Sequence, residues 1–347
     1  MFPLSVRFKT AVSISIITTL LRTHWTKSCR KNWRRIPQSS QSLLMLLQTW
    51  SSRCLVEVRL KLACAFAIGL FATVLCPSQG KEAISKADNF VTVYGAKIHY
   101  VEAGSGAPLI LIHGLADDVG IWDSIIPALS TKFRVIALDQ IGFGRSDKPL
   151  LNYRVGTFVD FLDGFLTELK IDRASLVGNS LGAWVAAVFT LTHPGRVDRL
   201  VLSDAAGYAV LAKTMDPRAM SALRLASRED IRYLGALTFH DKRFYQDIDA
   251  IFKQRVTAGD SYTVGQFLDS MVRGDDVLDN RLPMINRPTL VIWGRDDKII
   301  PLSFGERFHK EIANSRLQII DNCGHIPQLE CPTEFSAAVL QFLSDAR

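Results

Sequence analysis

The sequence predicts an α/β fold: a mostly parallel, doubly wound, eight-stranded sheet with helices on both faces and a helical cap insertion. Short apolar runs alternate with segments of helical spacing, which is typical of strands joined by helices in a parallel sheet. Several runs are continuously apolar, as expected of strands buried on both faces. The alternation stops at about Gly207 and resumes at Thr289. The expected strands span residues 90–94, 97–102, 108–112, 133–138, 174–177, 197–202, 289–293 and 316–320.

Each connection fits this order. The first two strands flank Gly95-Ala96 and predict a hairpin. Between the later strands, apolar residues recur at helical spacing, with one apolar face in each segment. The expected helices span residues 121–129, 155–169, 183–191, 303–312 and 332–343, with helical segments such as 219–225 and 244–256 in the insertion.

A chain of 347 residues, with 48% hydrophobic and 22% charged residues, can bury a large core. We expect a leader over residues 1–88, a core formed by 89–207 and 286–347, and the cap insertion over 208–285. The net charge of +7 is unevenly placed. Residues 1–61 hold eleven Lys or Arg against Glu57 alone, a charge of +10 that leaves −3 on the rest. Such a distribution argues against a nucleic-acid-binding domain.

The leader contains a segment at 62–80 that resembles an export signal. A basic flank precedes the apolar run 62–75, which ends in Ser78-Gln79-Gly80, a small-x-small pattern. We expect an exported (periplasmic or secreted) protein or one anchored to a membrane through this leader. The segment lies far from the first residue, so the true start of the chain could be near Val56. An organellar transit peptide, a cytoplasmic location and an uninformative tail remain alternatives.

The segment Gly178-Asn179-Ser180-Leu181-Gly182 lies between a predicted strand and a predicted helix. Gly-x-Ser-x-Gly in this setting is the nucleophile elbow, in which a strained turn exposes the serine hydroxyl. The motif alone is weak because it also occurs by chance, so its partners must support it. Ser180 is the expected nucleophile.

A serine nucleophile needs a base, and the base needs an acid that orients it. His325 is the expected general base, because it lies in a loop just after the last strand. Asp296 and Asp297 follow the preceding strand, and only one of two adjacent residues can face His325. Asp204 and Asp321 are further acids at strand ends. The other histidines fit other places: the leader, a partly exposed strand, a helix end, an unanchored position in the insertion and a helix surface (His24, His99, His193, His240 and His309).

Five segments in this order resemble the α/β-hydrolase fold family, in its cap-bearing serine hydrolase branch, over roughly residues 90–345. They are His113-Gly114, Asp139-x-x-Gly142-x-Gly144-x-Ser146, Gly178 to Gly182, Gly294-Arg295-Asp296-Asp297-x-x-x-Pro301 and Gly324-His325-x-Pro327-x-x-Glu330. The resemblance implies that Asp297 is the acid, with Asp296 less favoured. It also implies an oxyanion hole formed by the backbone N–H groups of Leu115 and Leu181. His113 is expected to brace its own loop by hydrogen bonds.

No cofactor is expected. Gly142-x-Gly144 lacks the third glycine of a dinucleotide fingerprint, and no cluster of His, Cys and Asp has metal-ligand spacing. Cys323 and Cys331 are the cysteines that follow the leader segment. We expect two free thiols, although a disulfide could close this short loop in an exported protein.

The expected function is a serine hydrolase that cleaves a small to medium carboxylic ester through an acyl-enzyme on Ser180, with a small-molecule ester as partner and no nucleic acid. The alternatives are a carbon–carbon bond hydrolase of ring-cleavage products, a perhydrolase, an amide hydrolase, and a non-catalytic binding protein on the same scaffold. Against the carbon–carbon alternative, the loop after His113 lacks the glycines and proline that the resemblance would imply, and Ile326 replaces a common aromatic residue. Ser180 disfavours dehalogenases and epoxide hydrolases, which resemble this pattern with an aspartate there.

Overall fold

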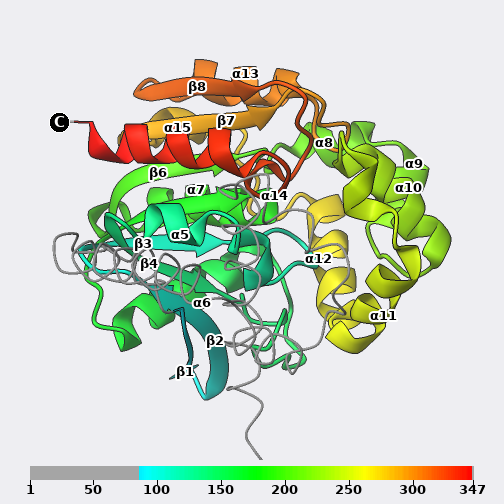
Figure 1. Cartoon of the computed structure of the whole chain (residues 1–347), viewed down its shortest axis with the longest axis horizontal. Coiled ribbons are helices and arrows are strands. Elements are labelled where there is room, and N and C mark those ends of the chain that lie inside the picture. Colours follow the sequence, from blue (N-terminus) through cyan, green and yellow to red (C-terminus); the bar gives the residue numbers. More distant parts are fainter. Residues whose placement is uncertain (1–85, 346–347) are drawn as a thin grey trace, which may run out of the picture. The chain divides into compact units, whose positions relative to one another are not determined.

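The computed structural model describes residues 86–345 (Figure 1), so the predicted leader lies outside the described residues except for its last three positions. Eight strands form one sheet in the order β1-β2-β4-β3-β5-β6-β7-β8. β1 pairs with β2 and β2 with β4 in antiparallel fashion, and the other neighbours are parallel. The predicted mostly parallel, eight-stranded α/β fold is therefore confirmed. The strands are β1 (Ala87–Val93), β2 (Ala96–Ala103), β3 (Ala107–Ile112), β4 (Phe133–Leu138), β5 (Ala174–Asn179), β6 (Val197–Ser203), β7 (Thr289–Gly294) and β8 (Ser315–Ile320).

Helices cover both faces of the sheet, as expected of a doubly wound fold. On one face, α6 (Val155–Glu168), α7 (Leu181–Thr192) and α13 (Leu302–Glu311) contribute to an apolar cluster that contains Phe165, Phe189 and Phe308. On the other face, α5 (Ile126–Leu129) and α15 (Pro332–Ser344) pack around Trp122 and Phe335. The central strands have buried apolar side chains on both faces because these two clusters cover both sides of the sheet.

The block between β6 and β7 is helical, with no strand among its residues. In Figure 1 its helices gather at one end of the sheet. The indole Nε1 of Trp184 at the start of α7 donates to the Asp276 carbonyl at 2.9 Å, which ties this block to the sheet. Its helices are α8 (Ala209–Thr214), α9 (Pro217–Ala222), α10 (Arg228–Thr238), α11 (Ile248–Ala258) and α12 (Ser261–Arg273), with 3₁₀ turns η3 (Lys242–Tyr245) and η4 (Leu282–Met284).

Two expected helices are each divided into a 3₁₀ turn and a shorter α-helix. The helix expected over 244–256 is divided into η3 and α11, because the Asp247 carboxylate accepts from the Ala250 amide and caps α11. The helix expected over 121–129 is divided into η1 (Val119–Trp122) and α5, and Asp118 caps η1. Two short elements, η2 (Pro194–Arg196) and α14 (Pro327–Glu330), were not predicted. No helix within residues 86–345 is both long and apolar enough to cross a lipid bilayer.

Candidate active site

Ser180 forms a sharp turn between β5 and α7. Its backbone has φ 54° and ψ −116°, a conformation that costs a residue with a side chain about 1–3 kcal/mol. Hydrogen bonds hold this turn: the Ser180 N–H donates to the Ser203 carbonyl at 2.9 Å, and the Trp184 N–H donates to the Ser180 carbonyl at 3.1 Å. The surrounding fold therefore imposes the strained conformation, as a nucleophile elbow requires.

The two glycines of the motif are required by the close approach of backbone. A Cβ on Gly182 would lie 2.0 Å from the Ile112 carbonyl oxygen in β3, and a Cβ on Gly178 would lie 2.3 Å from the Gly182 carbonyl oxygen. No side chain fits either position. The pattern Gly-x-Ser-x-Gly thus lets α7 pack directly against the end of the sheet.

His325 lies beyond the end of β8 and is paired with Asp297 beyond the end of β7. The His325 Nδ1 lies 2.7 Å from Asp297 Oδ2, and both side chains are buried. The second carboxylate oxygen, Oδ1, accepts from the amides of Ile299 and Ile300 at 2.8 and 2.9 Å. These bonds fix the carboxylate, which in turn orients the imidazole. The second ring nitrogen, Nε2, is left able to accept a proton.

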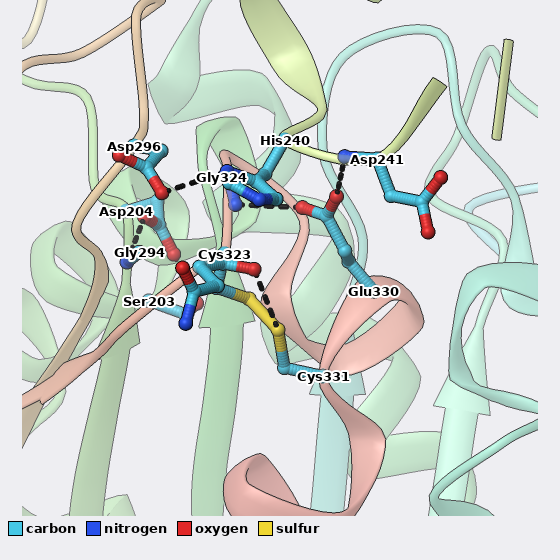
Figure 2. Close-up of a disulfide and its surroundings, with 11 residues drawn as sticks. Ser203, Asp204, His240, Asp241, Gly294, Asp296, Cys323, Gly324, Glu330 and Cys331 are labelled. Carbon is cyan, nitrogen blue, oxygen red and sulfur yellow. Dashed lines mark hydrogen bonds and ion pairs between the residues drawn. A yellow bond between two sulfur atoms is a disulfide. The ribbon is translucent and has the colours of Figure 1, made fainter. Parts of the chain in front are cut away.

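The adjacent Asp296 faces away from His325. Its carboxylate pairs with Nδ1 of His240 at 2.9 Å, and both side chains are substantially exposed (Figure 2). His240 was predicted to be unanchored, and this was wrong, because the end of α10 lies against the loop after β7. Of the four acids considered, Asp297 therefore contacts the predicted base, whereas Asp321 pairs with Arg295.

The elbow and the histidine loop lie side by side. The Asn179 Nδ2 donates to the His325 carbonyl at 3.0 Å, so the residue before Ser180 contacts the backbone of the predicted base. Within residues 86–345, no hydrogen bond joins the Ser180 hydroxyl to the imidazole. Such bonds in unliganded sites are often long and tighten when substrate binds.

Asp204, at the end of β6, stands next to this pair. It is fully buried, and its carboxyl group accepts from the Gly294 amide at 2.9 Å and the Ser203 hydroxyl at 2.7 Å. Three atoms that could bind a metal lie within 4.8 Å of one another: a carboxylate oxygen of Asp204, a carboxylate oxygen of Asp297 and a ring nitrogen of His325. Burial, reinforced by the charge of Asp297, raises the pKa of Asp204 well above its usual range. A neutral carboxylic acid at this position can donate to Asp297, which fits a hydrogen-bonded network rather than a cation site.

His113 braces the loop after β3, as predicted. Its Nδ1 donates to the Gly114 carbonyl at 2.8 Å, and its Nε2 accepts from the Gln140 amide at 3.0 Å. A Cβ on Gly114 would lie 3.4 Å from the Ser180 Cβ. The segment that contains Leu115 therefore passes directly beside the elbow, and Leu181 is the first residue of α7 after Ser180.

Comparisons with known proteins agree with this geometry. The α/β-hydrolase fold family model matches residues 107–332. The chain belongs to the α/β-hydrolase fold family. It is 34% identical over 267 residues to a 2-hydroxy-6-oxo-6-(2'-aminophenyl)hexa-2,4-dienoic acid hydrolase of Metapseudomonas resinovorans, covering 74% of this chain and 91% of the relative.

Two of the solved structures that are similar to this α/β-hydrolase differ in their activity. One is a bacterial membrane phospholipase A, with a TM-score of 0.68 and 28% identity over 84% of this chain and 98% of that chain. The other is the meta-cleavage product hydrolase CumD of Pseudomonas fluorescens IP01, with a TM-score of 0.67 and 31% identity over 74% of this chain and 98% of that chain. The chain is therefore a hydrolase of this family, and both kinds of relative bear on its substrate.

This α/β-hydrolase holds its histidine loop with a disulfide. Cys323 and Cys331 are bonded, with a Cα–Cα distance of 6.3 Å, so the expectation of two free thiols was wrong (Figure 2). The eight-residue spacing allowed a bond, but nothing in the sequence showed that α14 would turn Cys331 back toward Cys323. The bond closes the loop that contains His325.

Sequence reasoning gave no role to Glu330, although it stands in the Gly324-His325-x-Pro327-x-x-Glu330 segment. Its two carboxylate oxygens accept from the Gly324 amide and the Asp241 amide, both at 2.6 Å (Figure 2). The His325 amide also donates to the Thr238 carbonyl at 2.7 Å. The end of α10 is thus bound directly to the histidine loop.

The remaining predicted residues have structural contacts. His99 was expected to be partly exposed, but it is buried, and its Nδ1 lies 2.6 Å from Asp139 Oδ2. The Ser146 hydroxyl donates to the Asp139 carbonyl at 2.6 Å, so these residues shape the loop after β4. His193 stacks on Phe189 at the end of α7, and His309 is exposed on α13, as predicted.

Proposed function

We propose that this protein is a serine hydrolase that cleaves a carbon–carbon bond beside the 6-oxo group of a 2-hydroxy-6-oxo-2,4-dienoate. The observation that carries this proposal is a sequence identity of 34% to a relative named for such a substrate. The match covers 91% of that relative. Relatives named as 2-hydroxymuconate semialdehyde hydrolase and 2-hydroxy-6-oxo-2,4-heptadienoate hydrolase, at 32% and 31% identity, give the same substrate class. This reverses the order of our sequence-based expectation, in which the ester came first.

In this proposal Ser180 is the nucleophile, His325 the general base and Asp297 the acid that orients it. His325 Nε2 takes the hydroxyl proton as Ser180 Oγ attacks the 6-oxo carbon. Nδ1 of the ring is already held by Asp297 at 2.7 Å, which stabilises the imidazolium that forms. The substrate first moves its 2-hydroxyl proton to the carbon beside the 6-oxo group, which gives the 2-oxo tautomer. The bond between that carbon and the 6-oxo carbon then breaks, and its electron pair is delocalised onto the 2-oxo oxygen. The dienolate that leaves takes the proton from His325. Water activated by the same imidazole releases the acid from Ser180.

The negative charge that develops on the 6-oxo oxygen needs donors that are fixed beforehand. We assign this role to the backbone N–H groups of Leu115 and Leu181, which flank the elbow. One such donor typically contributes about 2.7–4 kcal/mol to the stability of the transition state. The bracing of its loop by His113 supports the role of Leu115, because a mobile donor would have to be reorganised during the reaction.

A carboxylic ester is the second candidate substrate, and the same three side chains would act on it. The similar membrane phospholipase A supports this candidate, since it covers a larger share of this chain than the carbon–carbon bond hydrolases do. The loop His113-Gly-Leu-Ala-Asp-Asp, without further glycine or proline, and Ile326 after the base also favour an ester.

Turnover of two substrate classes by the purified protein tests the proposal. Loss of the absorbance of 2-hydroxy-6-oxo-6-phenylhexa-2,4-dienoate is the primary assay, and a series of p-nitrophenyl esters of graded chain length is the second. Cleavage of the esters with an inert dienoate would reject the first candidate and leave the second. Labelling by a fluorophosphonate probe should occur in wild type and disappear in Ser180→Ala. Full activity of that variant, or a wild type that takes no label, would reject the mechanism.

A further inference from the structure

A carboxylate that the proposed mechanism does not use lies beside the elbow. The point where a Cβ on Gly114 would stand is 3.1 Å from Asp117 Oδ2 and 3.4 Å from the Ser180 Cβ, so Asp117 and Ser180 flank the same glycine. Asp118, the next residue, has a structural role, because its Oδ1 accepts from the Gly120 amide at 2.7 Å and caps η1. Two adjacent aspartates in this loop therefore face different surroundings.

The Asp117 carboxylate is half-buried and has no hydrogen-bond donor among residues 86–345. It keeps accessible surface and lines a cavity of about 510 Å³, which is bounded by its own loop, α11, the first two strands and the loop after β4. A carboxylate that has lost part of its hydration is costly without a donor, and such groups are normally hydrogen-bonded. The missing donor must therefore come from solvent or from a bound molecule.

Arg255, a cation that lines the same cavity, is already engaged elsewhere. Arg255 of α11 donates from Nη1 to Asp260 Oδ2 at 3.0 Å and to the Ala116 carbonyl at 2.9 Å. These bonds hold α11 against the loop and direct the guanidinium to Asp260, which is completely buried. Arg255 therefore closes one side of the cavity without forming an ion pair with Asp117.

We propose that Asp117 is a substrate-binding residue that accepts a hydrogen bond from a hydroxyl group of the substrate. If the proposed function holds, on which this identification of the donor rests, the group is the 2-hydroxyl of the dienoate. An ester without a hydroxyl group leaves the carboxylate without a donor, so Asp117 sets a preference between the two substrate classes. A site built to bind a hydroxyl discriminates strongly against an analogue that lacks it.

The charge state of Asp117 gives the proposal a pH dependence. Burial raises its pKa to about 6, Asp118 assists this rise, and Arg255, like His113 and His325 whenever they are protonated, opposes it. Only the ionised carboxylate is a strong acceptor, so hydroxyl recognition is weak below this pKa and complete above it. As the pH increases through about 6, kcat/KM should rise for a substrate that bears the hydroxyl. This rise should be larger than the rise for a substrate without the hydroxyl.

The test compares Asp117→Ala, Asp117→Asn and the control Asp118→Asn, which keeps a capping side chain. Loss of one hydrogen bond to a charged group predicts that Asp117→Ala lowers kcat/KM for the dienoate about 10- to 100-fold. The p-nitrophenyl butyrate value should stay within about threefold. Asp117→Asn should recover part of the dienoate activity through its amide oxygen and lose the extra rise near pH 6. The control should match wild type with both substrates.

An equal loss with both substrates would show a structural role and overturn the proposal, as would an unchanged dienoate activity. If wild type does not cleave the dienoate, the proposed function fails and the same variants are compared on p-nitrophenyl butyrate and p-nitrophenyl 3-hydroxybutyrate. A loss of activity on the hydroxylated ester only would then support hydroxyl binding by Asp117, although the proposed function had failed. Equal losses on both esters would reject it.

Discussion

Asp204 and Asp297 lie next to each other behind His325, each at the end of a different strand. Asp297 contacts the imidazole, and Asp204 is held by the Gly294 amide and the Ser203 hydroxyl. Two carboxyl groups this close cannot both be charged without a large cost. Because burial and the charge of Asp297 raise the pKa of Asp204, the negative charge of the pair resides on Asp297. Asp204 is then a neutral positioning residue.

Substitution by asparagine should separate these roles. Asp204→Asn keeps a neutral group that donates to Asp297, so we expect kcat to remain within about tenfold of wild type. Asp297→Asn cannot stabilise the imidazolium and should lower kcat about 10⁴-fold, the loss typical of a triad aspartate. The measurement is kcat on whichever substrate is turned over. If Asp204→Asn were the more damaging change, the charge would lie on Asp204 and the assignment would be reversed.

The same pair makes stability depend on pH. The folded-state pKa of Asp204 is raised, so its contribution is fully favourable below the unfolded value and is lost as pH rises toward the folded value. Wild type should therefore lose stability above about pH 4 through this group. We expect Asp204→Asn to melt at the same temperature as wild type in acid and at a higher temperature at neutral pH. Thermal unfolding at several pH values checks this, with Asp172→Asn, at an exposed position, as the control.

Much of this site could be predicted from the sequence because strand ends and motif spacing are local properties. The apolar runs located all eight strands, and the residues after β5, β7 and β8 are those that the structure gathers at the sheet edge. Asp297 could be preferred to Asp296 only by resemblance, since adjacent residues have the same spacing. In the structure, the amides of Ile299 and Ile300 donate to Asp297 and hold its carboxylate beside His325.

The contacts that the sequence did not predict join segments far apart in the chain. The ion pair of His240 with Asp296, the two bonds of Glu330 and the open surroundings of Asp117 depend on where the helical block rests against the sheet. No periodicity encodes that placement. The buried position of His99 likewise depends on Asp139 at the end of β4, a partner 40 residues away.

The disulfide should be measurable and should stabilise the protein. Cys323 and Cys331 close a loop of eight residues, for which the loss of chain entropy in the unfolded state predicts about 2–3 kcal/mol. Alkylation of the unfolded protein should add mass at these two cysteines only after reduction. Denaturant unfolding of Cys331→Ser should show the corresponding loss relative to oxidised wild type and little difference from reduced wild type. Alkylation of both thiols without reductant would contradict the bond.

Such a bond also bears on where the protein resides. Disulfides persist in oxidising compartments, so a stable bond would support our proposal of export or anchoring outside the cytoplasm. Protein isolated from its own cells with thiols blocked at lysis should contain the bond. If it were reduced there and oxidised only after exposure to air, the export proposal would lose this support.

Glu330 should couple the helical block to the position of His325. Its carboxylate accepts from the Gly324 amide next to His325, the proposed base, and from the Asp241 amide beyond α10, so one side chain ties both segments. In Glu330→Ala two partly buried amides lose a charged acceptor, which should cost about 1–3 kcal/mol of unfolding free energy. We expect kcat to fall about tenfold while KM changes less, because the base is displaced more than the binding surface.

Glu306→Ala is the matched control for this change, since Glu306 is an exposed glutamate on α13. It should leave both stability and kcat within error of wild type. Glu330→Gln retains one oxygen acceptor and should fall between the two, because an amide can satisfy one of the N–H groups but not both. If Glu330→Ala lost stability with kcat unchanged at a temperature where it is fully folded, the carboxylate would brace the fold without positioning His325.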